Sequence, residues 1–289
     1  MSRPLPRLAT VVCCLVLAGC ALRVQESHLV RPMPAPPTDL AALRAEYPAY
    51  TATEARIATP DGASLYQLRL QRPDARATVL YFGGNGYRIG LYAKYALRVY
   101  DALPVDLVLV DHRGYGGSTG TPTIAALQAD ALQVYDALRS DTAASGRPLI
   151  VHGQSLGSFL AGHVADARTL DGLVLESSMT TAEDWAAAMR ARSGFWTRLA
   201  VRRFDIAPAL QQAGNLEVAK RLDEPVLFVV GERDVVTAPR FSQALFDATP
   251  LPAQDKRLEI VPERGHNDAS FSPQFRAAML AMLDRVERD

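Results

Sequence analysis

The sequence predicts an α/β domain in which helices cover both faces of a mostly parallel sheet. Short apolar runs bounded by turn residues alternate with stretches of helical periodicity, as expected of successive strand–helix–strand units. The chain has 289 residues, 48% of them apolar, and is therefore long enough to bury a large core. Basic and acidic residues number 31 each, and this balance argues against a general nucleic-acid-binding surface.

The predicted strands are short, continuous apolar runs, which is typical of strands buried on both faces. They span residues 78–82, 105–110, 149–151, 173–175, 226–230 and 258–261. Helices with one apolar face are predicted at residues 123–140, 239–248 and 273–286. Before the first of these strands, Asp61-Gly62 separates two partly alternating segments between residues 55 and 70. This dipeptide favours a tight turn, so we expect an antiparallel hairpin there.

The N-terminus differs from the rest of the chain. Arg3 and Arg7 precede an apolar run over residues 8–18, and the run ends in Leu17-Ala18-Gly19-Cys20. It is too short to span a bilayer. The pattern resembles a bacterial lipoprotein signal, in which small residues allow cleavage before a lipidated cysteine; the alternative is an ordinary secretory signal that is cleaved elsewhere. We expect residues 1–19 to be removed and Cys20 to be lipidated, which would anchor the protein in the bacterial cell envelope.

Two further features fit this prediction. Cys13 and Cys14 lie in the removable segment, so Cys20 would be the only cysteine of the mature chain and no disulfide could form within it. Residues 20–54 include four prolines between residues 32 and 37, which predicts an extended tether. A motif for a proline-binding partner is the alternative, supported by composition alone. Ala21, rather than aspartate, favours the outer membrane if the host has one, by analogy with lipoprotein sorting.

The strongest chemical signal is Gly153-Gln154-Ser155-Leu156-Gly157, which directly follows an apolar strand and precedes a helical segment. A sharp turn in this context exposes the serine oxygen in a strained backbone geometry, and the glycines avoid collisions with the strand and the helix. The N-terminus of the following helix favours negative charge there. The pattern alone could be a simple turn, but the strand and helix around it predict that Ser155 is a nucleophile.

With this motif the chain resembles the α/β-hydrolase family over about residues 55–286, and most of all its small acyl-protein and lipid hydrolases. The resemblance implies a hydrolase domain over residues 55–289, an eight-stranded, mostly parallel sheet with helices on both faces, and a small cap inserted at about residues 177–224. It also implies a catalytic triad in the chain order serine, acid, histidine.

That chain order selects the base, because His266 alone follows both the last predicted strand and any candidate acid. The other histidines all come earlier, namely His28, His112, His152 and His163. For the acid, Asp234 ends Gly231-Glu232-Arg233-Asp234 after a strand and resembles the family's acid turn. Glu232 is the local alternative and Glu176, at the end of the preceding strand, is the more distant one. Asp234 could also be an ordinary turn carboxylate.

Two backbone amides should hold the oxyanion of the reaction. One is the N–H of Leu156, and the other is expected in Gly83-Gly84-Asn85-Gly86, with Asn85 as the first choice. Relatives often carry His-Gly where this chain has Gly83-Gly84, which leaves the second donor open. The glycine-rich turn at residues 111–118 resembles one that shapes the floor of the site. Neither glycine-rich segment matches a nucleotide-binding fingerprint, and no residue spacing predicts a metal site or a cofactor.

The predicted cap contains both tryptophans of the chain. We expect Trp185, Met189 and Trp196 to line an apolar pocket that binds substrate and prefers short or medium acyl chains. The alternative is that these side chains only pack the cap against the domain.

Together these patterns predict an enzyme that hydrolyses an acyl ester or thioester. Ser155 would be the nucleophile, His266 the base, and Asp234 the residue that orients the base. The expected partners are a small acyl substrate and, through lipidated Cys20, a membrane; no nucleic acid is expected. The alternatives are an exported serine peptidase or an acyltransferase with the same triad, or a non-catalytic binding protein with this fold.

Overall fold

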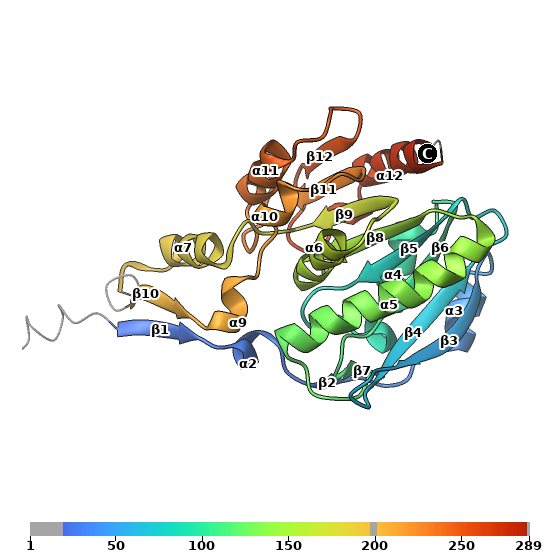
Figure 1. Cartoon of the computed structure of the whole chain (residues 1–289), viewed down its shortest axis with the longest axis horizontal. Coiled ribbons are helices and arrows are strands. Elements are labelled where there is room, and N and C mark those ends of the chain that lie inside the picture. The colour runs from blue at the N-terminus through green and yellow to red at the C-terminus, as the bar shows by residue number, and fades with distance from the viewer. Residues whose placement is uncertain (1–19, 197–200, 288–289) are drawn as a thin grey trace, which may run out of the picture.

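The computed structural model describes residues 20–196 and 201–287. At its centre lies an eight-stranded sheet in the order β12-β11-β9-β8-β5-β6-β4-β3 (Figure 1). At one edge of this sheet, β3 (Thr51–Ala58) and β4 (Ser64–Gln71) form the predicted antiparallel hairpin, and β4 pairs antiparallel with β6. The remaining strands run parallel to one another: β5 (Ala77–Phe82), β6 (Val105–Val110), β8 (Leu149–Gln154), β9 (Gly172–Glu176), β11 (Val226–Gly231) and β12 (Lys256–Val261).

Helices cover both faces of this sheet and bury it in two apolar clusters. On one face lie α4 (Ile89–Tyr100) and α12 (Pro273–Val286). On the other lie α5 (Ile124–Ser145), α6 (Leu156–Ala167) and α11 (Pro239–Ala248). Every residue of β5, β6, β8, β9 and β11 is buried, which explains why these strands are continuous apolar runs in the sequence. The predicted α/β class, with a mostly parallel sheet and helices on both faces, is confirmed.

The strand order also determines where loops meet. Strand β5 lies between β6 and β8, so the chain leaves β5 toward one side of the sheet and later returns on the other. Ligand sites in such sheets form at this reversal, outside the carboxyl ends of the strands. The loops after β5 and β8 carry the glycine-rich segment at residues 83–86 and Ser155, so the topology brings the two together.

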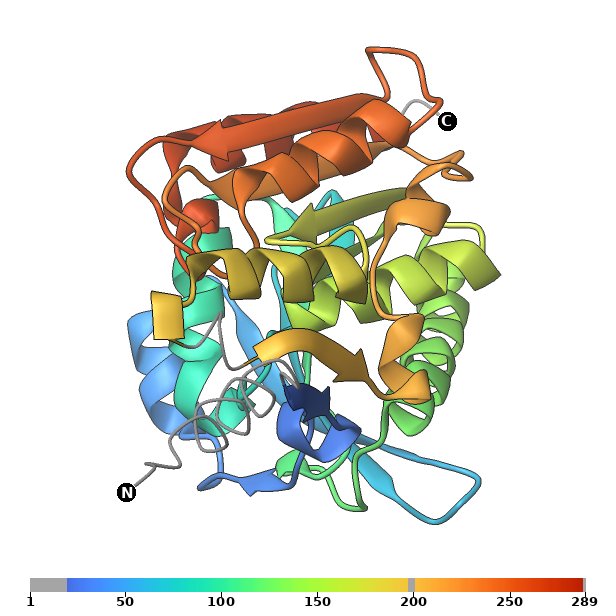
Figure 2. The same cartoon turned by 90° about the vertical axis from the view of Figure 1, so that its left-hand side faces the viewer.

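The part of the chain that connects β9 to β11 includes a small cap, which lies over this edge of the sheet (Figures 1 and 2). It consists of α7 (Ala182–Arg192), β10 (Val201–Ile206) and α9 (Pro208–Gln211). The next helix, α10 (Leu216–Ala219), packs against α6 and α11.

The segment after residue 20 is not the extended tether that its prolines predicted. Strand β1 (Cys20–Val24) pairs in parallel with β10 of the cap, and α2 (Glu26–Leu29) follows it. Next, β2 (Met33–Pro34) pairs with β7 (Tyr115–Gly116), and α3 (Leu40–Glu46) packs beside β3. The physical reason is that apolar side chains on both sides of the prolines are buried against the domain: Val30, Leu43, Tyr47 and Tyr50.

The predicted signal peptide, residues 1–19, lies outside the described residues, and the structure does not describe the side chain of Cys20. Within residues 20–196 and 201–287, no helix is both long and apolar enough to cross a membrane.

Candidate active site

Ser155 occupies a strained turn between β8 and α6, with φ 52° and ψ −112°. Its N–H donates to the carbonyl oxygen of Glu176 on the neighbouring strand (2.9 Å). The flanking glycines are required sterically, because a Cβ at Gly153 would collide with the Gly157 carbonyl and one at Gly157 with the Phe82 carbonyl. Backbone strain of this kind persists only where the surrounding structure enforces it, and it is common at functional sites.

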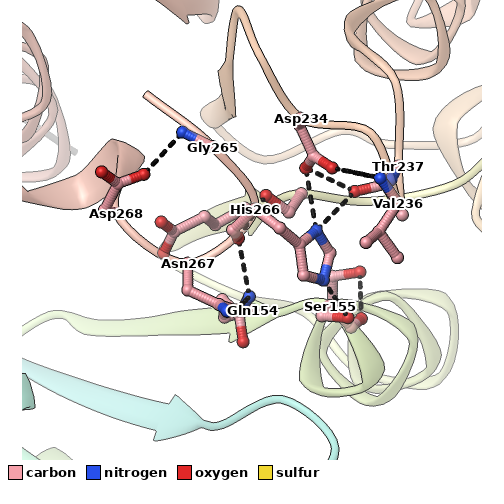
Figure 3. A network of polar contacts seen from close by, with 12 residues as sticks. Gln154, Ser155, Asp234, Val236, Thr237, Gly265, His266, Asn267 and Asp268 are labelled. Atoms are coloured by element: carbon pink, nitrogen blue, oxygen red, sulfur yellow. Dashed lines mark hydrogen bonds and ion pairs between the residues drawn. The ribbon is translucent and has the colours of Figure 1, made fainter. Parts of the chain in front are cut away.

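The structure brings the predicted serine, histidine and acid into one hydrogen-bonded line (Figure 3). Ser155 Oγ lies 2.9 Å from His266 Nε2, and Asp234 Oδ2 lies 2.9 Å from His266 Nδ1. Ser155 follows β8, Asp234 follows β11 and His266 follows β12, so each lies at the carboxyl edge of the sheet. With Nδ1–H donating to the carboxylate, Nε2 is free to accept the serine proton.

The carboxylate of Asp234 is fully buried and held by several donors (Figure 3). Its Oδ1 accepts from the backbone N–H groups of Val236 and Thr237, both at 2.8 Å, and its Oδ2 accepts from Thr237 Oγ1 at 2.8 Å. Burial raises the pKa of Asp234, but the hydrogen bonds and charge of His266 and the bonds from Thr237 together leave this pKa below its ordinary value. The carboxylate is therefore ionised at neutral pH and fixed in direction.

The other two candidate acids lie elsewhere. Glu232 is exposed, and its Oε2 accepts from the N–H of Glu263 (3.0 Å). Glu176 is buried beneath the site, where its carboxylate lies 3.2 Å from His152 Nε2 and accepts from the N–H of Ser270 (3.1 Å). Of the three carboxylates, the structure brings Asp234 to His266.

Side chains that the sequence did not single out hold the histidine loop in place. Gln154 Nε2 donates to the His266 carbonyl (3.1 Å) and to Asn267 Oδ1 (3.3 Å). Ser177 Oγ donates to the same carbonyl at 3.1 Å. Gln154 is a variable position of the serine motif, and Ser177 gains its role from a positive φ of 52° after β9. Neither feature is visible in a sequence pattern.

The two predicted oxyanion donors lie beside Ser155. Leu156 is the first residue of α6, and Asn85 follows β5. A Cβ at the adjacent Gly84 would come within 3.4 Å of Ser155 Cβ. Within the described part of the chain, the N–H groups of Leu156 and Asn85 donate to no protein acceptor, as expected for amides at a helix N-terminus and in an open turn.

The glycine-rich turn at residues 111–118 supports the loop that carries Asn85. His112 Nε2 donates to the Gly83 carbonyl (2.8 Å), and Tyr115 Oη donates to Asn85 Oδ1 (3.1 Å). Asp111 accepts from the N–H groups at the start of α4 and at Gly117, both within 2.8 Å. Burial raises the pKa of Asp111 to about 6. This turn therefore fixes the floor beneath the predicted oxyanion donors.

An apolar cavity of about 410 Å³ opens at Ser155 and His266. Trp185 lines it, as predicted, but Met189 and Trp196 lie outside its lining. Only the first turns of α7 reach the cavity, and Met189 lies about 6 Å further along the helix than Trp185, at 1.5 Å per residue. Trp196 comes after α7 and is 77% exposed.

The N-terminal segment forms a further wall of the cavity, which the sequence did not predict. The N-terminal segment contributes Val24, His28 and Leu29 to the lining, because β1 adds to the strand β10 of the cap. The rest of the wall comes largely from apolar side chains: Ile124, Leu156, Phe159, Met179, Ala182, Ile206, Leu210, Ala213 and Val236. Among residues 20–196 and 201–287, no group of three or more histidine, cysteine, aspartate or glutamate side chains could hold a metal ion.

Comparisons with known proteins bear on the family and the fold. Residues 73–216 match a family model described as "Serine aminopeptidase, S33". The chain is 30% identical to "Protein bem46" of Schizosaccharomyces pombe over 218 residues, covering 73% of this chain and 69% of that protein. It is 26% identical to the human "Alpha/beta hydrolase domain-containing protein 17B" over 203 residues, covering 70% and 65%.

Among solved structures, an esterase of Pyrococcus furiosus superposes with a TM-score of 0.69 at 15% identity, over 89% of this chain and 98% of that one. At this identity the likeness shows the fold alone, which is the α/β-hydrolase fold.

Proposed function

The chain belongs to the α/β-hydrolase family, and we propose that it is a serine hydrolase that cleaves an acyl ester or thioester. One observation carries the proposal: His266 lies 2.9 Å from both Ser155 Oγ and Asp234 Oδ2, at the mouth of an apolar cavity. Nucleophile, base and orienting acid in this relation are the arrangement required for acyl transfer through a covalent intermediate.

In the proposed mechanism, His266 Nε2 takes the proton of Ser155 as its Oγ attacks the acyl carbonyl carbon. The N–H groups of Leu156 and Asn85 stabilise the oxyanion of the tetrahedral intermediate. Asp234 stabilises the imidazolium, which then donates its proton to the departing oxygen or sulfur. Water attacks the acyl-enzyme with His266 again as base, and this step releases the carboxylic acid and restores Ser155.

The lining of the cavity favours an acyl group over the N-terminus of a peptide. An aminopeptidase must accommodate a free ammonium group, and a buried charge is costly unless it is paired. Of the described residues that line the cavity, none carries a carboxylate, and His28 and His266 are the only titratable side chains. A neutral acyl chain of short or medium length fits this surface, and each buried methylene would contribute about 0.8 kcal/mol.

A labelling experiment tests the proposal. A fluorophosphonate probe should label the mature protein at Ser155, as located by peptide mapping, and should not label Ser155→Ala. A panel of acyl esters, acyl thioesters and aminoacyl anilides with matched chromophores should show turnover of the first two classes. Labelling at another serine would refute the nucleophile, and faster turnover of aminoacyl anilides would favour the peptidase.

We also propose that Cys20 is lipidated and anchors the enzyme in the bacterial cell envelope. The support is the sequence around Cys20. Because Cys20 pairs with Val201 of β10, a lipid on this residue would lie beside the cap. Cys20→Ser should abolish incorporation of radiolabelled fatty acid and release active enzyme from the membrane fraction. Cys14→Ser, within the predicted signal, is the matched control and should retain incorporation. A wild-type protein that is soluble and unlipidated in its host would refute the anchor.

A further inference from the structure

The N-terminal segment is paired with the rest of the chain at two points, and the part between them lines the apolar cavity. At the first point Val24, on β1, pairs with Ile206 on β10. At the second, Met33 on β2 pairs with Tyr115 on β7. Figure 1 shows α2 between these two points, beside the start of α5. The backbone of residues 24–33 therefore follows a fixed path along the cavity.

Glu26 holds this path against the body of the domain. Its Oε1 accepts from the backbone N–H of Ile124, the first residue of α5. That N–H has no acceptor within its own helix, and the N-terminus of a helix attracts negative charge, so a carboxylate suits the position. The N–H of Val30 donates to the Glu26 carbonyl (2.9 Å), and Val30 is 2% exposed. Residues 24–30, the N-terminal wall, are thus fixed on both sides of α2.

Two apolar side chains of the N-terminal wall, Val24 and Leu29, line the cavity. Both are half-buried and pack on the apolar cluster between the sheet and α5, α6 and α11. The residues that hold the wall also line the cavity, namely Ile206, which pairs with Val24, and Ile124, which donates to Glu26. Because these four lining side chains are hydrocarbon, this side of the cavity suits an acyl chain.

The N-terminal wall and the histidine loop lie on opposite sides of Ser155. Ser155 follows β8, near the middle of the sheet, whereas His266 follows β12 at one edge. Figure 1 shows α2 and the start of α5 on the other side, away from β11 and β12. His266 has to protonate the departing group, so the leaving group must lie on the histidine side. The acyl chain is then directed to the other side, toward Val24 and Leu29.

We propose that Val24 and Leu29 are specificity-determining residues that limit the length of the acyl chain, and that Glu26 is the residue that positions them. The inference rests on the proposed ester hydrolase function. It assigns part of the acyl pocket to the N-terminal segment, in addition to the cap. A short or medium acyl chain would end at the N-terminal wall, and a longer chain would collide with it.

The test compares kcat/KM for the p-nitrophenyl esters of dodecanoic and hexanoic acid. Leu29→Ala should raise the ratio of dodecanoyl to hexanoyl kcat/KM by about tenfold, since the space it leaves accommodates about two methylene groups. Leu29→Phe should lower the same ratio by about fivefold, because a larger side chain overpacks the end of the pocket. A residue that only stabilises the fold would not shift the ratio in opposite directions. Val24→Ala and Val24→Phe repeat the comparison at the second position.

Leu22→Ala and Leu22→Phe are the matched controls. Leu22 also lies on β1, but it is 50% exposed and outside the lining of the cavity. Neither control should change the ratio of dodecanoyl to hexanoyl kcat/KM by more than about twofold.

Glu26 is tested by the division of its effect between KM and kcat. Glu26→Ala should raise KM for the hexanoyl ester by about fivefold and lower kcat less, because the wall contacts the acyl chain and not the reacting atoms. Glu26→Gln keeps an oxygen that can accept from Ile124 and should restore most of the wild-type KM.

Thermal melting establishes that each variant is folded, and the pair at either Val24 or Leu29 suffices for the test. Folded variants that keep the wild-type ratio, or a pair whose members shift it in the same direction, would overturn the role of the N-terminal wall alone. Failure of the wild-type enzyme to hydrolyse any acyl ester would overturn the proposed function and the role of the wall with it.

Discussion

The carboxyl edge of the sheet and the cap above it contribute different kinds of contact to the site around Ser155. The sheet supplies His266 and Asp234 from loops that directly follow parallel strands, and hydrogen bonds of 2.8–2.9 Å fix their directions. The cap and the N-terminal segment supply apolar side chains from short elements, and their contacts have no fixed direction. The chemical step thus depends on side chains that hydrogen bonds hold at the sheet edge. The choice of substrate depends on apolar packing by the cap and the N-terminal segment.

The largest effects should follow from changes at the sheet edge. Ser155→Ala and His266→Ala should each lower kcat for an acyl ester by about four to six powers of ten, because triad members act as a unit. For the same reason the double variant should be little worse than either single one. Steady-state rates with active-site-titrated wild type as reference measure this. An active Ser155→Ala enzyme would contradict the assignment of the nucleophile.

Asp234→Asn should have the next largest effect, a loss of about three to four powers of ten in kcat. Asparagine can donate to His266 Nδ1 and so favour the wrong tautomer of the imidazole. Thr237→Val is the matched control, since it removes one hydrogen bond to Asp234 while the charge remains. Its loss should be about tenfold. Equal losses in the two variants would show that the charge of Asp234 is not what matters.

The sequence predicts the sheet edge better than it predicts the cap and the N-terminal segment. Strands β5, β8 and β11, the Ser155 turn and the position of His266 are fixed by local patterns, because buried parallel strands are continuous apolar runs that end in functional loops. Gln154, Ser177 and Thr237 escaped prediction since their roles depend on which loops meet. The N-terminal wall escaped it because the pairing of β1 with β10 joins two segments far apart in the sequence, which no local pattern reveals.

The two tryptophans of the cap test whether its packing selects the acyl chain. Trp185→Ala should lower kcat/KM for an octanoyl ester relative to an acetyl ester by roughly tenfold, because apolar area that buries the chain is lost. Trp196→Ala should leave this ratio within about twofold of wild type, since Trp196 is 77% exposed and outside the cavity. An acyl-length series with p-nitrophenyl esters gives both ratios. If Trp185→Ala folds and keeps the wild-type profile, the cap does not select the acyl group.

The smallest effect is expected where the cap returns to the sheet, at Glu224. This side chain is 4% exposed, its Oε1 has no partner among the described residues, and burial raises its pKa to about 7. Below its ordinary pKa of 4.5 the carboxyl is protonated in both the folded and the unfolded state. As pH rises from 4.5 toward 7, Glu224 ionises in the unfolded chain but stays protonated in the folded chain. The free energy of unfolding therefore falls over this range.

Glu224→Gln removes this titration. The free energy of unfolding of the variant, relative to that of wild type, should therefore increase by about 2 kcal/mol from pH 5 to pH 8. Denaturant unfolding at the two pH values measures the difference. Glu217→Gln is the control, because Glu217 is exposed, pairs with Lys220 at 2.6 Å and has a pKa lowered by that pair, so it stays ionised throughout this range. Glu224 precedes β11 at the end opposite Asp234, so kcat should not change. Parallel pH profiles for wild type and Glu224→Gln would show that the buried carboxyl titrates normally.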